Sequence, residues 1–171
     1  MKTIKKFKLS LANDIEKEAK WLTEMSAKGF HFSNYKWGFY LFEEDHSKSY
    51  IYQTDFQEAD EEYFELYKLA GWEHVHTEIS QYHYFRAAKN EIGDKRIYSD
   101  PASVRGMYKR MLWFYFIIFV CMLVAQTGLL VMWSDDLLSK IAVAFVSAVI
   151  VLYIYLFIKL LQKLRKYEKL I

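Results

Sequence analysis

Two long apolar segments, Met111–Trp133 and Leu137–Leu161, stand near the end of the chain, and only a Ser-Asp-Asp turn separates them. The first has no charged residue, and the second is uncharged from Ile141 to Ile158. A helix rises 1.5 Å per residue, so about 20 predominantly apolar residues cross the hydrocarbon core of a bilayer. The pattern predicts a transmembrane helical hairpin over residues 108–171, with a basic tail at its end.

The first hundred residues have shorter periodicities. Leu22 and Met25 follow helical spacing, and Gly29 is placed to terminate that helix. Phe30 and Phe32 then alternate with polar neighbours, as in a strand with one covered face. This part of the chain therefore predicts a mixed α and β domain.

The same order of elements occurs twice in this domain, at a spacing of about 42 residues. In each copy an apolar helical segment ends at a glycine: Trp21, Leu22 and Met25 before Gly29, and Tyr63, Phe64 and Tyr67 before Gly71. Later in each copy, the pair Tyr40 and Phe42 matches Tyr82 and Tyr84. We predict an internal repeat of strand, helix, strand, strand over about residues 5–44 and 48–87.

The expected fold class is α+β. We predict about six antiparallel strands with two helices packed on one face, a variant of the ferredoxin-like plait, followed by the two-helix transmembrane hairpin. The expected domains are a cytoplasmic domain over residues 1–89, a linker over 90–107 around Pro101, the only proline, and the hairpin over 108–171.

Charge divides the chain in two. Residues 1–104 hold 14 basic and 18 acidic residues, a net charge of −4, and the remainder holds 9 and 3, a net charge of +6. Lysine and arginine flank the outer ends of both apolar segments, and the turn between them has only acid. By the positive-inside rule we expect a multi-pass cell-membrane protein with both termini cytoplasmic. A mildly acidic domain also argues against binding nucleic acid.

Four short runs in this domain carry a resemblance to a known bacterial family: Lys20–Phe30, Tyr50–Asp55, Gly71–Glu73 and Tyr84–Arg86. The domain resembles the "domain of unknown function 2812" group, small membrane proteins often encoded beside PadR-type regulators. The resemblance covers roughly residues 3–88. Because the family has no established activity, the resemblance implies no catalytic residues, only a membrane-linked regulatory or accessory role.

Three histidines are the strongest candidates for chemistry. His74 and His76 are two residues apart and would share one strand face, and His83 on the next strand could approach them. Three imidazoles can bind zinc or copper, but the repeat places His74 where the first copy has Phe32, which favours a role in packing. The acidic clusters lie at a hairpin end and a helix start, where solvated carboxylates are ordinary. We expect no catalytic residue, no metal and no cofactor.

Aromatic side chains suggest a binding surface instead. A domain of about 90 residues uses many such rings in its core, but tyrosines on both strand faces would leave some exposed. The candidates for partner binding are Trp37, Tyr50, Tyr52 and Tyr82. In the hairpin, the candidates for helix packing, within the chain or with another membrane protein, are Gln126, Gly128, Ala144 and Ala148.

The leading hypothesis is a non-enzymatic regulatory or accessory protein anchored in the lipid bilayer. Its cytoplasmic domain, and in a second contact its hairpin, would bind a protein partner: a cytoplasmic regulator, a membrane transporter complex or another copy of itself. The alternative is a membrane-linked sensor of a small or amphiphilic ligand. A membrane-anchored enzyme ranks third, because the sequence contains no glycine-rich phosphate loop and no nucleophile elbow.

Overall fold

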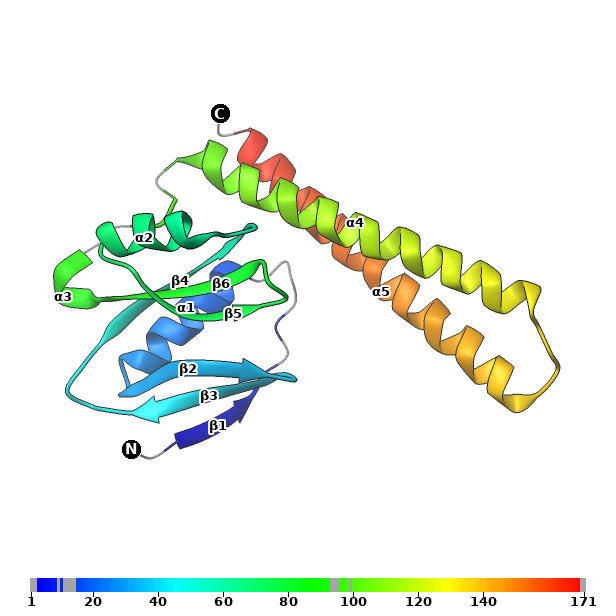
Figure 1. Ribbon diagram of the computed structural model, residues 1–171, viewed down its shortest axis with the longest axis horizontal. Coiled ribbons are helices and arrows are strands. Elements are labelled where there is room, and N and C mark those ends of the chain that lie inside the picture. The colour runs from blue at the N-terminus through cyan, green and yellow to red at the C-terminus, as the bar shows by residue number, and fades with distance from the viewer. Residues whose placement is uncertain (1–2, 9, 11–14, 93–95, 99, 170–171) are drawn as a thin grey trace. The chain divides into compact units, whose positions relative to one another are not determined.

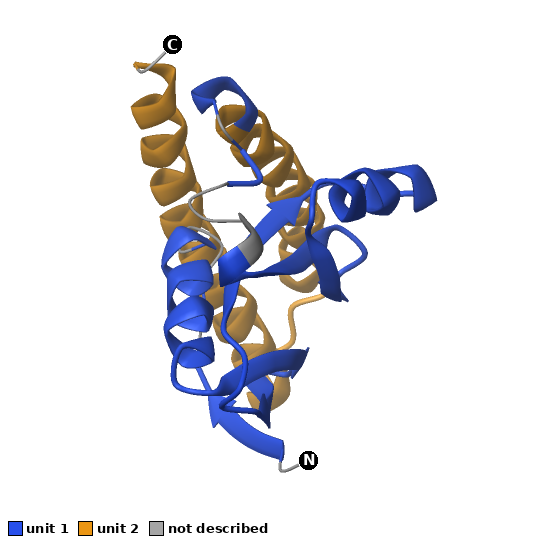
Figure 2. Cartoon of the chain, turned by 90° about the vertical axis from the view of Figure 1, so that its left-hand side faces the viewer, with its two compact units in different colours: residues 1–103 blue, residues 104–171 orange. Residues whose placement is uncertain are grey.

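The computed structural model describes residues 3–8, 10, 15–92, 96–98 and 100–169. The chain forms two compact units, residues 1–103 and residues 104–171. Figure 2 colours these units separately.

The first unit combines strands and helices (Figure 1). Its elements are β1 (Thr3–Phe7), α1 (Ile15–Ser26), β2 (Phe30–Lys36), β3 (Phe39–Glu44), β4 (Tyr50–Phe56), α2 (Glu61–Leu69), β5 (Glu73–Glu78), β6 (Tyr82–Ala88) and the short α3 (Lys89–Ile92). All strand pairs are antiparallel. The α+β class is confirmed.

The six strands form two sheets of three. The first sheet has the order β1-β3-β2 and the second has the order β4-β6-β5. We expected one layer of about six strands, with both helices on one face. Helix α1 is the physical reason that the strands form two sheets. It occupies the edge of β4, where the first sheet would have to pair to make one continuous sheet.

Two hydroxyl groups of α1 bind that edge. The backbone N–H of Tyr52 donates to Thr23 Oγ1 at 2.9 Å, and the N–H of Tyr50 donates to Ser26 Oγ at 2.8 Å. An edge strand has unpaired backbone donors that must be covered or satisfied. Side chains of α1 satisfy these two donors, so the strand needs no further strand beside it there.

A large aromatic core lies between α1 and both sheets. Leu22 and Met25 of α1 pack with rings of the first sheet, including Phe32, and with Tyr52 and Tyr84 of the second. A second core lies on the opposite face of the second sheet, where α2 contributes Tyr63 and the partly buried Tyr67 and the sheet contributes Phe85. The second sheet is therefore covered on both faces, and the two helices pack on opposite sides of it.

Both halves have the same strand order, and they differ by one residue at the second hairpin. The β2–β3 hairpin closes with two residues, since Lys36 pairs with Phe39, whereas Glu78 of β5 pairs with Tyr82 across three. Both hairpins also shift register at equivalent places, between residues 32 and 34 and between residues 74 and 76.

The extra residue in the β5–β6 hairpin shows that our matching of β3 with β6 in the predicted repeat was wrong by one position. Phe32 pairs with Phe42 in the first sheet, and His74 pairs with Phe85 in the second, so Phe85 and not Tyr84 is the counterpart of Phe42. A shift of one residue moves every side chain of a strand to the other face. Tyr84 accordingly points away from α2 and joins the core around α1.

The second unit consists of two long helices, α4 (Pro101–Val131) and α5 (Leu137–Glu168). Both are long and apolar enough to cross a membrane. Asp136 caps α5 by accepting from the N–H of Ser139 at 2.9 Å, and Asp135 pairs with Lys140 at 2.7 Å. Since α4 begins at Pro101, the end of the stretch that we expected as a linker, residues 90–107, is helical.

Candidate functional site

A buried carboxylate from α1 lies at the centre of the first unit. Glu18 is only 4% exposed and accepts hydrogen bonds on both oxygens. The hydroxyls of Tyr40 and Tyr84 donate to Oε1 at 2.5 and 2.8 Å, and those of Tyr82 and Ser10 donate to Oε2 at 3.0 and 2.9 Å. Four hydroxyl donors satisfy a charge whose burial would otherwise be costly. We call these five residues the Glu18 cluster.

The Glu18 cluster ties the two halves of the domain together. Tyr40 comes from β3, whereas Tyr82 and Tyr84 come from β6. Burial and the nearby charge of Glu18 raise the pKa of both β6 tyrosines well above the ordinary value, so these hydroxyls keep their protons and act as donors. The cluster is therefore a hydrogen-bonded joint between the sheets.

The sequence contains a signal for this carboxylate that we did not use. Glu18 stands three residues after Ile15 and four before Leu22, so all three share one helical face, and all three are buried. An acidic residue on an apolar helical stripe indicates a buried, partnered carboxylate.

A second carboxylate, Glu78 at the end of β5, lies within electrostatic range of the cluster. Burial and then repulsion by Glu18 raise the pKa of Glu78 to about 7. Burial and then the charge of Glu78 also raise the pKa of Tyr35. Glu78 is the group near the cluster whose charge changes within the neutral pH range.

Asp55 of β4 forms a similar arrangement beneath α2. It is 1% exposed and accepts from the hydroxyls of Tyr63 at 2.7 Å, Tyr67 at 3.2 Å and Tyr98. The backbone N–H of Phe56 also donates to it, at 2.6 Å. Each core therefore contains one buried acid that accepts from three tyrosines. The sequence did not indicate this arrangement, and Tyr98 lies in the stretch that we expected as a linker.

The histidines form a chain of hydrogen bonds with a fixed direction. His83 Nε2 donates to the carbonyl oxygen of Gln57 at 2.9 Å, so Nδ1 accepts from the hydroxyl of Thr77 at 2.8 Å. That hydroxyl in turn accepts from His74 Nε2 at 2.7 Å. Burial lowers the pKa of His74, His76 and His83 below the ordinary value, which favours neutral rings.

This chain uses both ring nitrogens of His83. His76 instead packs its ring against Phe32 and Tyr84, with centroids 6.2 and 6.1 Å apart. Within the described ranges, no group of three or more potential ligand side chains is placed to hold a metal ion. The three histidines thus take part in packing and hydrogen bonding.

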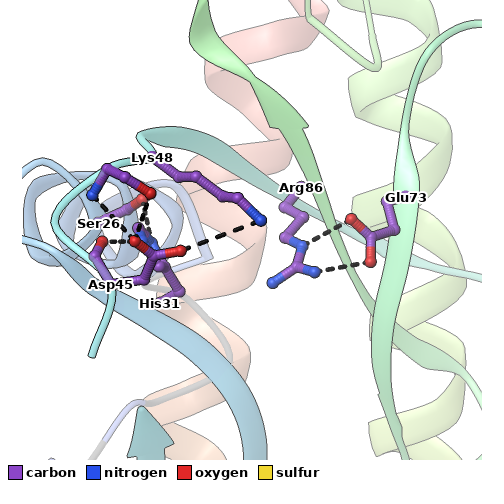
Figure 3. Close-up of polar contacts among 7 residues, drawn as sticks. Ser26, His31, Asp45, Lys48, Glu73 and Arg86 are labelled. Atoms are coloured by element: carbon purple, nitrogen blue, oxygen red, sulfur yellow. Dashed lines mark hydrogen bonds and ion pairs between the residues drawn. The ribbon is translucent and has the colours of Figure 1, made fainter. Parts of the chain in front are cut away.

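A serine–histidine pair lies at the other end of α1 (Figure 3). Ser26 and His31 are both buried, and Ser26 Oγ lies 2.9 Å from His31 Nδ1. His31 Nε2 contacts the backbone carbonyl of Asp45 at 2.6 Å and not its carboxylate, so Nε2 donates and Nδ1 accepts from Ser26. Ser26 also accepts from the N–H of Tyr50. The pair holds the β3–β4 connection onto α1 and presents no exposed nucleophile.

Arg86 and Glu73 form the most regular ion pair at the surface of the domain (Figure 3). Arg86 donates from Nε and Nη2 to the two Glu73 oxygens at 2.8 and 2.7 Å. Its guanidinium also lies 4.5 Å from the centroid of the Tyr50 ring. This contact joins β5, β6 and β4 and takes up one face of Tyr50.

The four aromatic residues predicted to bind a partner have different environments. Trp37 is 85% exposed, whereas Tyr52 is 2% exposed and belongs to the core. Tyr50 is partly buried beneath Arg86, and Tyr82 donates to Glu18. The prediction that Tyr52 lies on an exposed binding surface is therefore wrong, because both faces of the second sheet are covered. Of the four, Trp37 is the one that is mainly exposed.

The residues predicted to pack the hairpin also differ. Gln126 Nε2 donates to Ser147 Oγ of α5 at 3.1 Å. Gly128, Ala144 and Ala148 are exposed, and a Cβ added to Gly128 would meet no atom within 4 Å. These small residues do not line the contact between α4 and α5. That contact includes ring pairs, Tyr115 with Tyr153, Phe116 with Phe157 and Phe119 with Phe157.

A family model described as a protein of unknown function, DUF2812, matches residues 14–120. The chain belongs to the DUF2812 family. The DUF2812 match begins just before α1 and extends into α4, so it starts later and ends later than residues 3–88, which carried the resemblance in the sequence. No curated protein and no solved structure matches the chain.

Proposed function

We propose that this DUF2812 protein is a membrane-anchored accessory protein, without catalytic activity of its own, that binds a protein partner through its α+β domain. The hairpin would cross the bilayer twice and hold the domain at the cytoplasmic face. The turn between the helices is too short to form an extracellular domain. The recognition surface then lies on the cytoplasmic side.

One observation carries this proposal: the polar side chains best suited to chemistry are bound to one another. Glu18 and Asp55 each accept from three tyrosines, and Ser26, His31 and His83 are buried with hydrogen-bond partners. A catalytic acid, base or nucleophile must reach a substrate. Groups held in this way stabilise a rigid domain, and rigid domains suit recognition.

The charges of the second unit support the proposed orientation. Lys109 and Arg110 precede the apolar part of α4, and the end of α5 has a cluster of basic residues from Lys159 to Lys169. Asp135 and Asp136 lie at the turn. Because basic residues in short flanking segments resist translocation, both helix ends that face away from the turn belong on the cytoplasmic side.

The outer side of α2 is the surface that we assign to the partner. Leu66 and Leu69, one helical turn apart, are 60% and 83% exposed. Glu61, Glu62 and Glu65 are also exposed on this helix. Adjacent exposed leucines bordered by acids suit a partner with an apolar groove and basic residues at its rim.

Co-purification tests the proposal directly. The full chain, tagged and expressed in its native host, is cross-linked in membranes and extracted in mild detergent. We expect a stoichiometric protein partner that is lost from the double variant Leu66→Ser/Leu69→Ser. The variant Ile79→Ser, which removes a 57% exposed apolar side chain elsewhere, should retain it. A homogeneous monomer with no bound protein would overturn the proposal.

A further inference from the structure

The first sheet has an outer face, opposite α1, that no described element of the first unit covers. By strand register, this face holds Phe7, Phe39 and Leu41, together with Lys5 and Lys36. Phe7 is 66% exposed and contacts Phe39 with ring centroids 5.2 Å apart. The equivalent face of the second sheet is buried against α1, so the exposure is particular to the first sheet.

The hairpin at the end of this face presents a tryptophan in an unfavourable backbone conformation. Trp37 has φ of +53° and Gly38 has φ of +81°, as both central residues of a type I′ turn require. Asparagine or aspartate is the usual first residue of such a turn, and a bulky side chain there is uncommon. Trp37 is 85% exposed, so it contributes little to the core. Its position therefore disfavours folding without a compensating internal contact.

Among the described strand residues, the charged side chains at this end of the face are lysines. Lys36 directly precedes Trp37, and Lys5 lies with its Nζ 4.1 Å from the centroid of the Phe39 ring. The acid on the same face, Glu43, pairs with Thr3 at the other end of β1, away from the turn. An exposed tryptophan and phenylalanine with flanking lysines is the composition that binds the interface of an anionic bilayer.

We propose that this end of the first sheet, which we call the Trp37 face, docks onto anionic lipid headgroups, with Trp37 inserted at the interface. The proposal rests on the proposed membrane anchoring, because the hairpin keeps the domain close to the bilayer at all times. Docking then orients the domain on the membrane and leaves the outer side of α2 for the partner. Lysines attract anionic lipids electrostatically, so docking depends on both lipid charge and salt.

The second hairpin offers a matched control. Ile79 also has positive φ, +44°, at the first position of its turn and is 57% exposed, but it follows Glu78 where Trp37 follows Lys36. The test uses the full chain with Cys121→Ser, which removes the single cysteine, and either Trp37→Cys or Ile79→Cys labelled with an environment-sensitive fluorophore. Both sites are exposed, so labelling should not disturb folding.

The labelled proteins are reconstituted into vesicles of phosphatidylcholine alone or of phosphatidylcholine with phosphatidylglycerol. We expect a blue shift at position 37, and quenching there by nitroxide-labelled lipid, in the anionic vesicles only. Both effects should disappear at about 1 M salt, where the Debye length is about 3 Å. The fluorophore at position 79 should report an aqueous environment in every condition. The double variant Lys5→Glu/Lys36→Glu should reduce quenching of the fluorophore at position 37 to the level seen at position 79. The charge-matched variant Lys20→Glu/Lys28→Glu, with one exposed lysine on α1 and one in the turn that follows it, should leave it unchanged.

Three results would overturn the proposal. The first is a fluorophore at position 37 that reports an aqueous environment while the protein floats with the vesicles. The second is equal quenching at positions 37 and 79. The third is an efficient disulfide between unlabelled Trp37→Cys chains, which would assign the face to a second copy of this chain. Failure of the protein to float at high salt would instead refute the membrane anchoring itself, so the two failures are distinguishable.

Discussion

Replacing Glu18 by alanine removes the acceptor that the buried Tyr40 and Tyr84 share with the partly buried Tyr82. The hydroxyls of Tyr40 and Tyr84 lose the Oε1 atom to which they donate at 2.5 and 2.8 Å. Tyr82 keeps a second contact, with Thr54 Oγ1 at 3.4 Å. A buried hydroxyl left without a partner costs about 1–3 kcal/mol, and two of them cost about 2–6 kcal/mol. Removing the buried charge recovers part of its desolvation cost, so we expect a net loss of about 2–4 kcal/mol.

The assay is denaturant unfolding of the full chain in detergent, followed by tryptophan fluorescence. Trp21 reports directly, because its ring centroid lies 4.9 Å from that of Tyr40. The control is Glu24→Ala on the same helix, where an exposed carboxylate lies 4.0 Å from Lys20 and an ion pair of this kind contributes less than about 1 kcal/mol. If Glu18→Ala loses no more stability than Glu24→Ala, the Glu18 cluster does not join the sheets.

Three further predictions concern pH, topology and a turn. The pKa of Glu78 is about 7 in the folded domain against an ordinary 4.5, so the folded state binds more protons between those values and the free energy of unfolding falls as pH rises through that window. Glu78→Gln should remove this decrease and stabilise the protein at pH 8, as unfolding curves at pH 5 and pH 8 will show. If the variant keeps the wild-type difference in unfolding free energy between the two pH values, Glu78 is not its source. With Cys121→Ser, Asp135→Cys should react with a membrane-impermeant maleimide in intact cells, and reaction only after lysis would reverse the proposed orientation. Gly38→Ala should destabilise the domain by about 1–2 kcal/mol, because φ is +81° and the new Cβ would lie 2.8 Å from Phe7 Cε2; thermal unfolding at an unchanged midpoint would contradict this expectation.

The proposals assign different tasks to different surfaces of one chain. The two buried acids, Glu18 and Asp55, fix the domain internally. The Trp37 face is assigned to the bilayer, and Leu66 and Leu69 of α2 are assigned to a protein partner. The assignments are independent, because a variant on one surface leaves the other side chains in place. Partner capture and lipid quenching can therefore be measured on the same set of proteins.

Local patterns were sufficient to predict the elements of the domain. Helix α1 ends where Gly29, at φ of +83°, reverses the chain, and alternation at Phe30 and Phe32 marks the strand that follows. The two apolar helices could be predicted from length and composition, because a run of about 20 uncharged residues is rare outside membranes and large cores. Such features depend on neighbours within a few positions, which a sequence displays directly.

The buried acids required the tertiary structure. Glu18 and Tyr84 are 66 positions apart along the chain, so no local spacing indicates that they meet. The extra residue between Glu78 and Tyr82 was also not evident from local spacing. It places each β6 residue on the strand face opposite to the one that a repeat of constant length predicts. Matching Tyr84 to Phe42 was reasonable by composition and wrong by register.

The α+β class and the two helices that could span a membrane followed from local periodicity and composition, and the family followed from short runs of sequence. Which surfaces are covered became known from the tertiary structure. It divided six strands into two sheets, buried Tyr52 in a shared core and left Trp37 exposed. The physical reason is that burial depends on which distant segments pack together, and one helix, α1, satisfies the edge of β4 while filling the space between both sheets.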